Sequence, residues 1–178
     1  KEGFGNGMLG MTLDPDFDRN NFIYFFYTPN KMPARQNISR FVINKNNVLD
    51  LASEKVLIEI PIELEVSAHT GGSLAWDKDH NLFISVGDNT VPFESEGFAP
   101  IDEIPGRITF DAQRSSANTN DLRGKILRIH PEADGTYTIP EGNLFPKGTP
   151  QTRPEIFVMG CRNPYRMSVD QKTSTVYW

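Results

Sequence analysis

The sequence has little cysteine, no long apolar run and no excess of basic residues. Its single cysteine, Cys161, excludes an intrachain disulfide and a cysteine-rich zinc cluster. No apolar run approaches the roughly 20 residues of a membrane-spanning helix, so we predict no membrane span. A formal net charge of -5 argues against a nucleic-acid partner, because phosphate binding favours a basic surface. These absences leave chemistry on a small molecule as the favoured class of function.

Short apolar segments rich in Phe, Ile, Val and Tyr alternate with clusters of Asp, Asn, Gly and Pro, which is typical of an all-β protein. Four of these segments at the start of the chain predict one antiparallel meander of strands. Further strands are expected at 73–76, 82–86, 125–129 and 156–159. The first four strands are expected at Met8 to Leu13, Phe22 to Thr28, Ile38 to Ile43 and Glu54 to Ile60.

A phrase of strand, Asp-containing turn and aromatic strand occurs at 10–28, 72–86 and 166–178. Any series of hairpins could produce such phrases, but repeated units of four short strands favour a β-propeller. We predict blade 1 at about 8–62, blade 2 at about 72–160 and the start of blade 3 at about 165–178. Because propellers usually have four to eight blades, we interpret the chain as about three blades of a longer protein.

A polar insertion interrupts the second predicted blade at 88–122. Loops of this length inside a compact domain are usually functional or disordered. The insertion is therefore expected to be either an ordered cover over a site or a solvated excursion.

The segment His69-Thr70-Gly71-Gly72 precedes a predicted strand, which brings an imidazole and flexible backbone to a sheet edge. Histidine can accept a proton near neutral pH, and glycine lets a ligand approach the backbone. A histidine at such a junction can equally serve as a turn hydrogen-bonder. Cys161 is expected to be a buried or spare thiol, since nothing in its spacing indicates an activating base.

Five motifs, in this order, resemble the PQQ-dependent soluble sugar dehydrogenases, which include soluble quinoprotein glucose dehydrogenase and the aldose sugar dehydrogenases. The resemblance covers nearly the whole chain and implies a six-bladed propeller of which roughly the first half is present. The motifs lie at 7–17, 69–72, 84–88, 122–129 and 153–164.

The resemblance implies roles for four residues. His69 corresponds to the general base that removes a proton from the anomeric hydroxyl of a sugar. Arg162 and Asn163 correspond to residues near the quinone oxygens, where a guanidinium would stabilise negative charge. Asp88 is expected to orient the substrate or the histidine, with a turn-capping carboxylate as the alternative.

The sequence also departs from the family. Members related to glucose dehydrogenase have an acidic residue directly before the histidine, where this chain has Ala68, and a substrate-facing polar residue at about the place of Gly5. Both changes leave the sugar open. The main anchors for the PQQ carboxylates and the Ca²⁺ ligands are expected outside this chain, so the isolated piece is expected to be inactive. Asp14, Asp16 and Asp18 alternate as in calcium loops, but the pattern is incomplete, and we predict turn capping there and no metal site.

The function predicted from the sequence is therefore oxidation of an aldose or related alcohol by hydride transfer to PQQ. The expected partners are a sugar substrate, an external electron acceptor and the remaining blades of the propeller. The resemblance implies a periplasmic or secreted location. The alternative is a non-catalytic propeller that binds a ligand or carbohydrate, because the same fold supports many functions.

Overall fold

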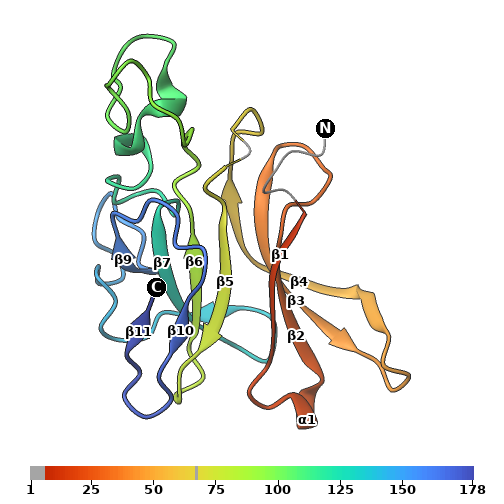
Figure 1. Ribbon diagram of the computed structural model, residues 1–178. Coiled ribbons are helices and arrows are strands. Elements are labelled where there is room, and N and C mark those ends of the chain that lie inside the picture. Colours follow the sequence, from red (N-terminus) through yellow and green to blue (C-terminus); the bar gives the residue numbers. More distant parts are fainter. Residues whose placement is uncertain (1–6, 67) are drawn as a thin grey trace.

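The computed structural model describes residues 7–66 and 68–178. Two antiparallel sheets lie side by side, and a short hairpin follows them at the C-terminal end (Figure 1). The strands are β1 (Met8–Leu13), β2 (Phe22–Tyr27), β3 (Arg35–Ile43), β4 (Leu49–Pro61), β5 (Gly71–Trp76), β6 (Leu82–Val86), β7 (Lys125–Pro131), β8 (Tyr137–Thr138), β9 (Ile156–Met159), β10 (Ser168–Val169) and β11 (Val176–Tyr177).

The first sheet is the meander β1-β2-β3-β4, in which every neighbouring pair is antiparallel. The predicted position of β1 is confirmed, whereas β3 and β4 extend beyond their predicted bounds. Tyr24, Phe26, Ile38 and Ile60 bury one face of this sheet. Buried and more exposed side chains alternate from residue 24 to 27 in β2 and from 58 to 61 in β4, which is the period of two of a sheet with one core face.

The second sheet has the order β5-β6-β7, with β9 paired to the other edge of β7 and β8 paired to its end. All five residues of β6 are buried. The strand is covered on both faces because β10 and β11 lie against the side of this sheet that faces away from the first one (Figure 1). The first sheet spans 8–61, the second 71–159 and the hairpin 168–177, and the division into blades stays a prediction.

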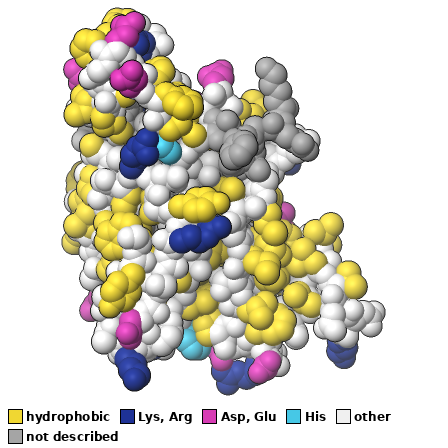
Figure 2. Space-filling model, viewed as in Figure 1, with side chains coloured by type: hydrophobic (Ala, Val, Ile, Leu, Met, Phe, Trp, Pro, Cys, Tyr) yellow, Lys and Arg dark blue, Asp and Glu magenta, His cyan; other side chains and the backbone are white. Residues whose placement is uncertain are grey.

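The insertion between β6 and β7 carries two single-turn 3-10 helices, η1 (Ile108–Phe110) and η2 (Ala112–Arg114). Residues 91–121, called the lobe below, extend beyond one end of the second sheet (Figure 1). Figure 2 shows hydrophobic side chains gathered at the surface there. The exposed large apolar residues of the lobe are Phe93, Phe98, Ile101, Ile104 and Ile108.

A helix that the sequence analysis did not predict, α1 (Phe17–Asn20), lies in the turn between β1 and β2. Asp14 closes this turn: its carboxylate accepts hydrogen bonds from the Asp16 amide (2.9 Å), Asn20 Nδ2 (2.8 Å) and the Tyr24 hydroxyl (3.0 Å). The bond from the Asp16 amide N–H to the Asp14 carboxylate, two residues apart, is typical of an Asx turn. The geometry agrees with the expected turn capping at Asp14.

The two sheets meet where β1 passes β5. A Cβ atom on Gly10 would lie only 1.9 Å from the carbonyl oxygen of Gly72, so the backbones approach too closely for any side chain at position 10. Nearer the other end of this contact, Trp76 packs edge-on against Tyr24 with ring centroids 5.1 Å apart. The Trp76 indole N–H also donates to the Leu13 carbonyl oxygen at 2.8 Å. Aromatic packing and backbone approach together fix the spacing of the sheets.

Within the described ranges, no helix is long and apolar enough to cross a membrane.

Replacing Gly10 by alanine tests the close approach of the sheets. We expect Gly10→Ala to lower the free energy of unfolding by about 2 kcal/mol, because the added methyl group forces the two backbones apart. Met11→Ala, at an exposed position of the same strand, is the matched control and is expected to cost less than about 0.5 kcal/mol. Urea denaturation of both variants decides the matter, and equal costs would contradict this account of the interface.

Candidate active site

His69 and Asp88 lie at the same end of the second sheet. His69 lies two positions before the first residue of β5, and Asp88 lies two positions after the last residue of β6. The register pairs Gly71 with Val86 across these antiparallel strands. Adjacent antiparallel strands place the start of one beside the end of the next. The sheet therefore brings together two side chains that are 19 positions apart in the sequence.

The two side chains form a buried hydrogen bond. Nδ1 of His69 lies 2.9 Å from Oδ1 of Asp88, and the side chains are 5% and 1% exposed. The same carboxylate oxygen accepts the Thr90 amide N–H at 2.9 Å and the Thr90 hydroxyl at 2.8 Å. An ionised carboxylate can only accept, so in the neutral imidazole of His69 this contact places the proton on Nδ1 and the lone pair on Nε2. Across the part of the chain that the structure describes, no residue forms a hydrogen bond with Nε2.

A glycine makes room for this arrangement. A Cβ on Gly87 would lie 1.9 Å from the carbonyl oxygen of His69, so only glycine fits directly before Asp88. The Gly-Asp sequence thus serves two purposes, because the glycine admits the histidine backbone and the aspartate binds its ring.

Arg162 and Asn163 reach the same place from the loop after β9. The carbonyl oxygen of Arg162 accepts the Asp88 amide N–H at 2.9 Å, and the exposed guanidinium donates from Nη2 to the Pro92 carbonyl oxygen at 3.2 Å. Oδ1 of Asn163 accepts the Gly71 amide N–H at 3.0 Å, which orients its Nδ2 group as a donor. All four residues that the sequence singled out therefore lie around one end of the second sheet, and their catalytic roles stay predictions.

The interpretation of the motif glycines as room for a ligand differs from the structure. A Cβ on Gly72 would lie 2.6 Å from Cβ of Leu9, so the space beside this glycine is filled by the first sheet. Gly5, one of the two family departures, lies outside the described residues.

Cys161, the single thiol of the chain, lies in the loop after β9. Cys161 is buried, and burial raises the pKa of its thiol, which lowers its nucleophilicity at neutral pH. In residues 7–66 and 68–178, no group of three or more His, Cys, Asp or Glu side chains is placed to hold a metal ion.

Lys125, at the start of β7, is a buried charge that the sequence analysis missed. Its side chain is fully buried, and Nζ donates to the carbonyl oxygens of Ser115 (2.7 Å), Ser116 (3.1 Å) and Arg123 (2.7 Å). Burial lowers the pKa of this ammonium to about 8, so it remains charged at pH 7. A lysine at the head of an otherwise apolar strand is the sequence signal that could have revealed it. Lys125 fastens the end of the lobe to the sheet.

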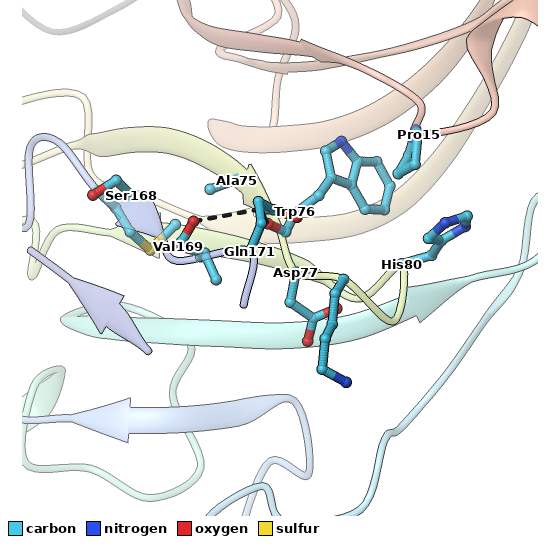
Figure 3. Close-up of a pocket in the computed structure, with 10 residues that line it drawn as sticks. Pro15, Ala75, Trp76, Asp77, His80, Ser168, Val169 and Gln171 are labelled. Atoms are coloured by element: carbon cyan, nitrogen blue, oxygen red, sulfur yellow. Dashed lines mark hydrogen bonds between the residues drawn. The ribbon is translucent and has the colours of Figure 1, made fainter. Parts of the chain in front are cut away.

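A cavity lies at the opposite end of the second sheet. It has a volume of about 530 Å³ and is lined in part by Trp76, Asp77 and His80 from the β5–β6 turn (Figure 3). Gln171, from the β10–β11 turn, donates to the Trp76 carbonyl oxygen across this cavity. Because Trp76 pairs with Leu82 at one end of β5 and Gly71 with Val86 at the other, the cavity is separate from the His69 site.

Comparison with known proteins shows the family of this chain. The family model described as glucose/sorbosone dehydrogenase matches residues 2–178. The chain belongs to this family. An uncharacterized protein of Synechocystis is 30% identical over 173 residues, covering 96% of this chain and 37% of that protein. The aldose sugar dehydrogenase YliI of Escherichia coli is 26% identical, covering 96% of this chain and 39% of the enzyme.

The chain is also similar to the human Hedgehog-interacting protein, whose name describes an interaction and not an enzyme. It is 28% identical over 188 residues, which cover 99% of this chain and 24% of that protein. The solved PQQ-bound aldose sugar dehydrogenase of Streptomyces coelicolor has a TM-score of 0.66 at 21% identity, covering 99% of this chain and 42% of the enzyme. This likeness shows that the antiparallel sheets match part of a sugar dehydrogenase fold. The chain spans between about a quarter and two fifths of the length of these proteins.

Replacing Lys125 by methionine tests its role in fastening the lobe. We expect Lys125→Met to lower the free energy of unfolding by about 3 kcal/mol, because three buried carbonyl oxygens lose their donor. Lys78→Met, which removes an exposed ammonium paired with Asp79, is the control and is expected to change stability by less than about 0.5 kcal/mol. If urea denaturation gives Lys125→Met the stability of the control, the buried ammonium does not hold the lobe.

Proposed function

We propose that the whole protein oxidises an aldose sugar or a related alcohol with PQQ as the hydride acceptor and His69 as the general base. The observation that carries this proposal is the buried His69–Asp88 hydrogen bond, which directs the proton to Nδ1 and leaves Nε2 with no hydrogen-bond partner among residues 7–66 and 68–178. Membership of the glucose/sorbosone dehydrogenase family supports it.

The polar groups at the His69 end of the sheet suit part of a PQQ site. Arg162 has an exposed guanidinium that donates to the Pro92 carbonyl oxygen, and Asn163 has an Nδ2 donor oriented by the Gly71 amide N–H. Quinone carbonyl oxygens accept hydrogen bonds and gain negative charge on reduction, which such donors stabilise. Arg162 and Asn163 would hold this edge of the cofactor, while the anchors for its carboxylates and the Ca²⁺ ligands are expected elsewhere in the whole protein.

His69 would remove the proton from the substrate hydroxyl through Nε2 while Asp88 stabilises the resulting imidazolium. PQQ, when bound, supplies the electrophile that takes the hydride from the same carbon and later passes electrons to an external acceptor. The substrate thus loses one proton to His69 and one hydride, which balances the oxidation of an alcohol to a carbonyl. A periplasmic or secreted location belongs to this proposal and follows from the family resemblance.

A second candidate is a non-catalytic binding module. The observation in its favour is the similarity to the human Hedgehog-interacting protein along 99% of this chain. The two candidates differ in what they require of His69, because a binding module has no need of a free Nε2 next to cofactor donors.

Removal of the imidazole distinguishes the two. We expect the whole protein and its His69→Ala variant both to bind PQQ in the presence of Ca²⁺ by calorimetric titration. Aldose-dependent dye reduction by His69→Ala should fall roughly a thousandfold, because the general base is lost.

His80→Ala is the matched control, since His80 lies in an exposed turn at the other end of the sheet, and it should keep full activity. Absence of PQQ binding by the unaltered protein would reject the enzyme and leave the binding module.

A further inference from the structure

A buried amide lies next to the His69–Asp88 pair. Asn89 is 2% exposed, and its backbone N–H donates to the carbonyl oxygen of His69 at 3.1 Å. Its side-chain oxygen accepts the Glu63 amide N–H at 2.8 Å, and its Nδ2 donates to the Val66 carbonyl oxygen at 3.0 Å. One residue therefore binds both the histidine backbone and the turn that precedes it.

Arg114, at the end of η2 in the lobe, binds the same turn. Its Nη1 lies 2.7 Å from each carboxylate oxygen of Glu63, and its Nη2 donates to the Asn89 carbonyl oxygen at 2.8 Å. The arginine side chain is only 12% exposed. Hydrogen bonds between ionised groups are stronger than neutral ones, and partial burial protects this pair from screening by salt. The lobe is thus connected to the segment that delivers the histidine.

The backbone of His69 needs such support. Its φ of +52° lies in the left-handed region, and Asn89 has a φ of +54°. A left-handed conformation costs a non-glycine residue roughly 1 kcal/mol or more and persists only where the surroundings impose it. The contacts of Asn89 with His69, and of Arg114 with Asn89, are the contacts that impose it here.

We propose that Arg114, acting through Glu63 and Asn89, is a positioning residue that holds His69 in register with Asp88. Arg114 does not touch the imidazole. Arg114 binds Glu63, which precedes His69, and Asn89, which follows Asp88. Through these contacts the lobe helps to set the orientation of Nε2. The consequence for catalysis rests on the proposed function, whereas the effect on the His69–Asp88 hydrogen bond does not.

The hydrogen bond itself is the first measurement. In cofactor-free protein with ¹⁵N-labelled histidine, we expect Arg114→Ala to speed exchange of the His69 Nδ1 proton with solvent by about tenfold or more, because the hydrogen bond opens more often. Arg114→Lys keeps the charge and should restore part of the protection. Arg107→Ala is the matched control, since Arg107 lies in the same lobe and pairs with Glu96 and Asp102, not with Glu63, and it should leave exchange unchanged.

Kinetics of the PQQ-loaded whole protein give a second readout. Arg114→Ala should lower kcat by roughly tenfold to a hundredfold, as expected for a displaced base, and leave KM near its original value. Glu63→Gln, which removes the charge with little change in shape, should act in the same direction and decides the matter if Arg114→Ala fails to fold. The proposal is overturned if the folded variants keep the exchange rate of the unaltered protein, or if Arg107→Ala accelerates exchange equally. A protein without sugar oxidation would refute the proposed function and leave the exchange experiment valid.

Discussion

The hydrogen bond between Nδ1 of His69 and the Asp88 carboxylate is the contact around which this end of the molecule is organised. Burial strengthens this hydrogen bond, because the surroundings have a low dielectric constant. It also requires further donors to the carboxylate, since an unpaired buried charge would destabilise the fold. Thr90 supplies two further donors to the same oxygen. Gly87 is required because any larger residue would collide with the histidine backbone. The sheet supplies the two strand ends, and the local sequence supplies the groups that satisfy the charge.

The lobe and the second sheet depend on each other through buried polar contacts. The Lys125 ammonium donates to three backbone carbonyl oxygens at the junction of the lobe and β7. Arg114 connects the lobe to the turn before His69. The large apolar side chains of the lobe, in contrast, lie at the surface. The insertion is thus attached to the second sheet and to the turn before His69 by these contacts, and whether it covers the site stays a prediction.

Sequence reasoning located most strands because their hydrophobic pattern is local. It also selected His69, Asp88, Arg162 and Asn163, which the structure brings to one sheet end. It missed α1, whose single turn has no apolar period to detect. It missed Asn89, Arg114 and Lys125 because their partners are backbone groups or residues far away in the chain. The motif glycines were assigned to ligand approach, whereas at Gly72 the neighbouring sheet fills the space. The hydrophobic pattern of the sequence thus predicts strands, whereas the hydrogen-bond partners of buried polar residues are seen only in the three-dimensional structure.

The role of the Asp88 carboxylate at Nδ1 of His69 is decided by kcat of the PQQ-loaded whole protein with Asp88→Asn. This substitution keeps the shape of the side chain but replaces the acceptor at Nδ1 by an amide that can place a donor there. The imidazole would then hold its proton on Nε2, where it cannot act as a base. If Asp88 directs the proton to Nδ1, we expect kcat to fall roughly a thousandfold or more while PQQ binding is retained. Activity within a few fold of the unaltered protein would contradict it.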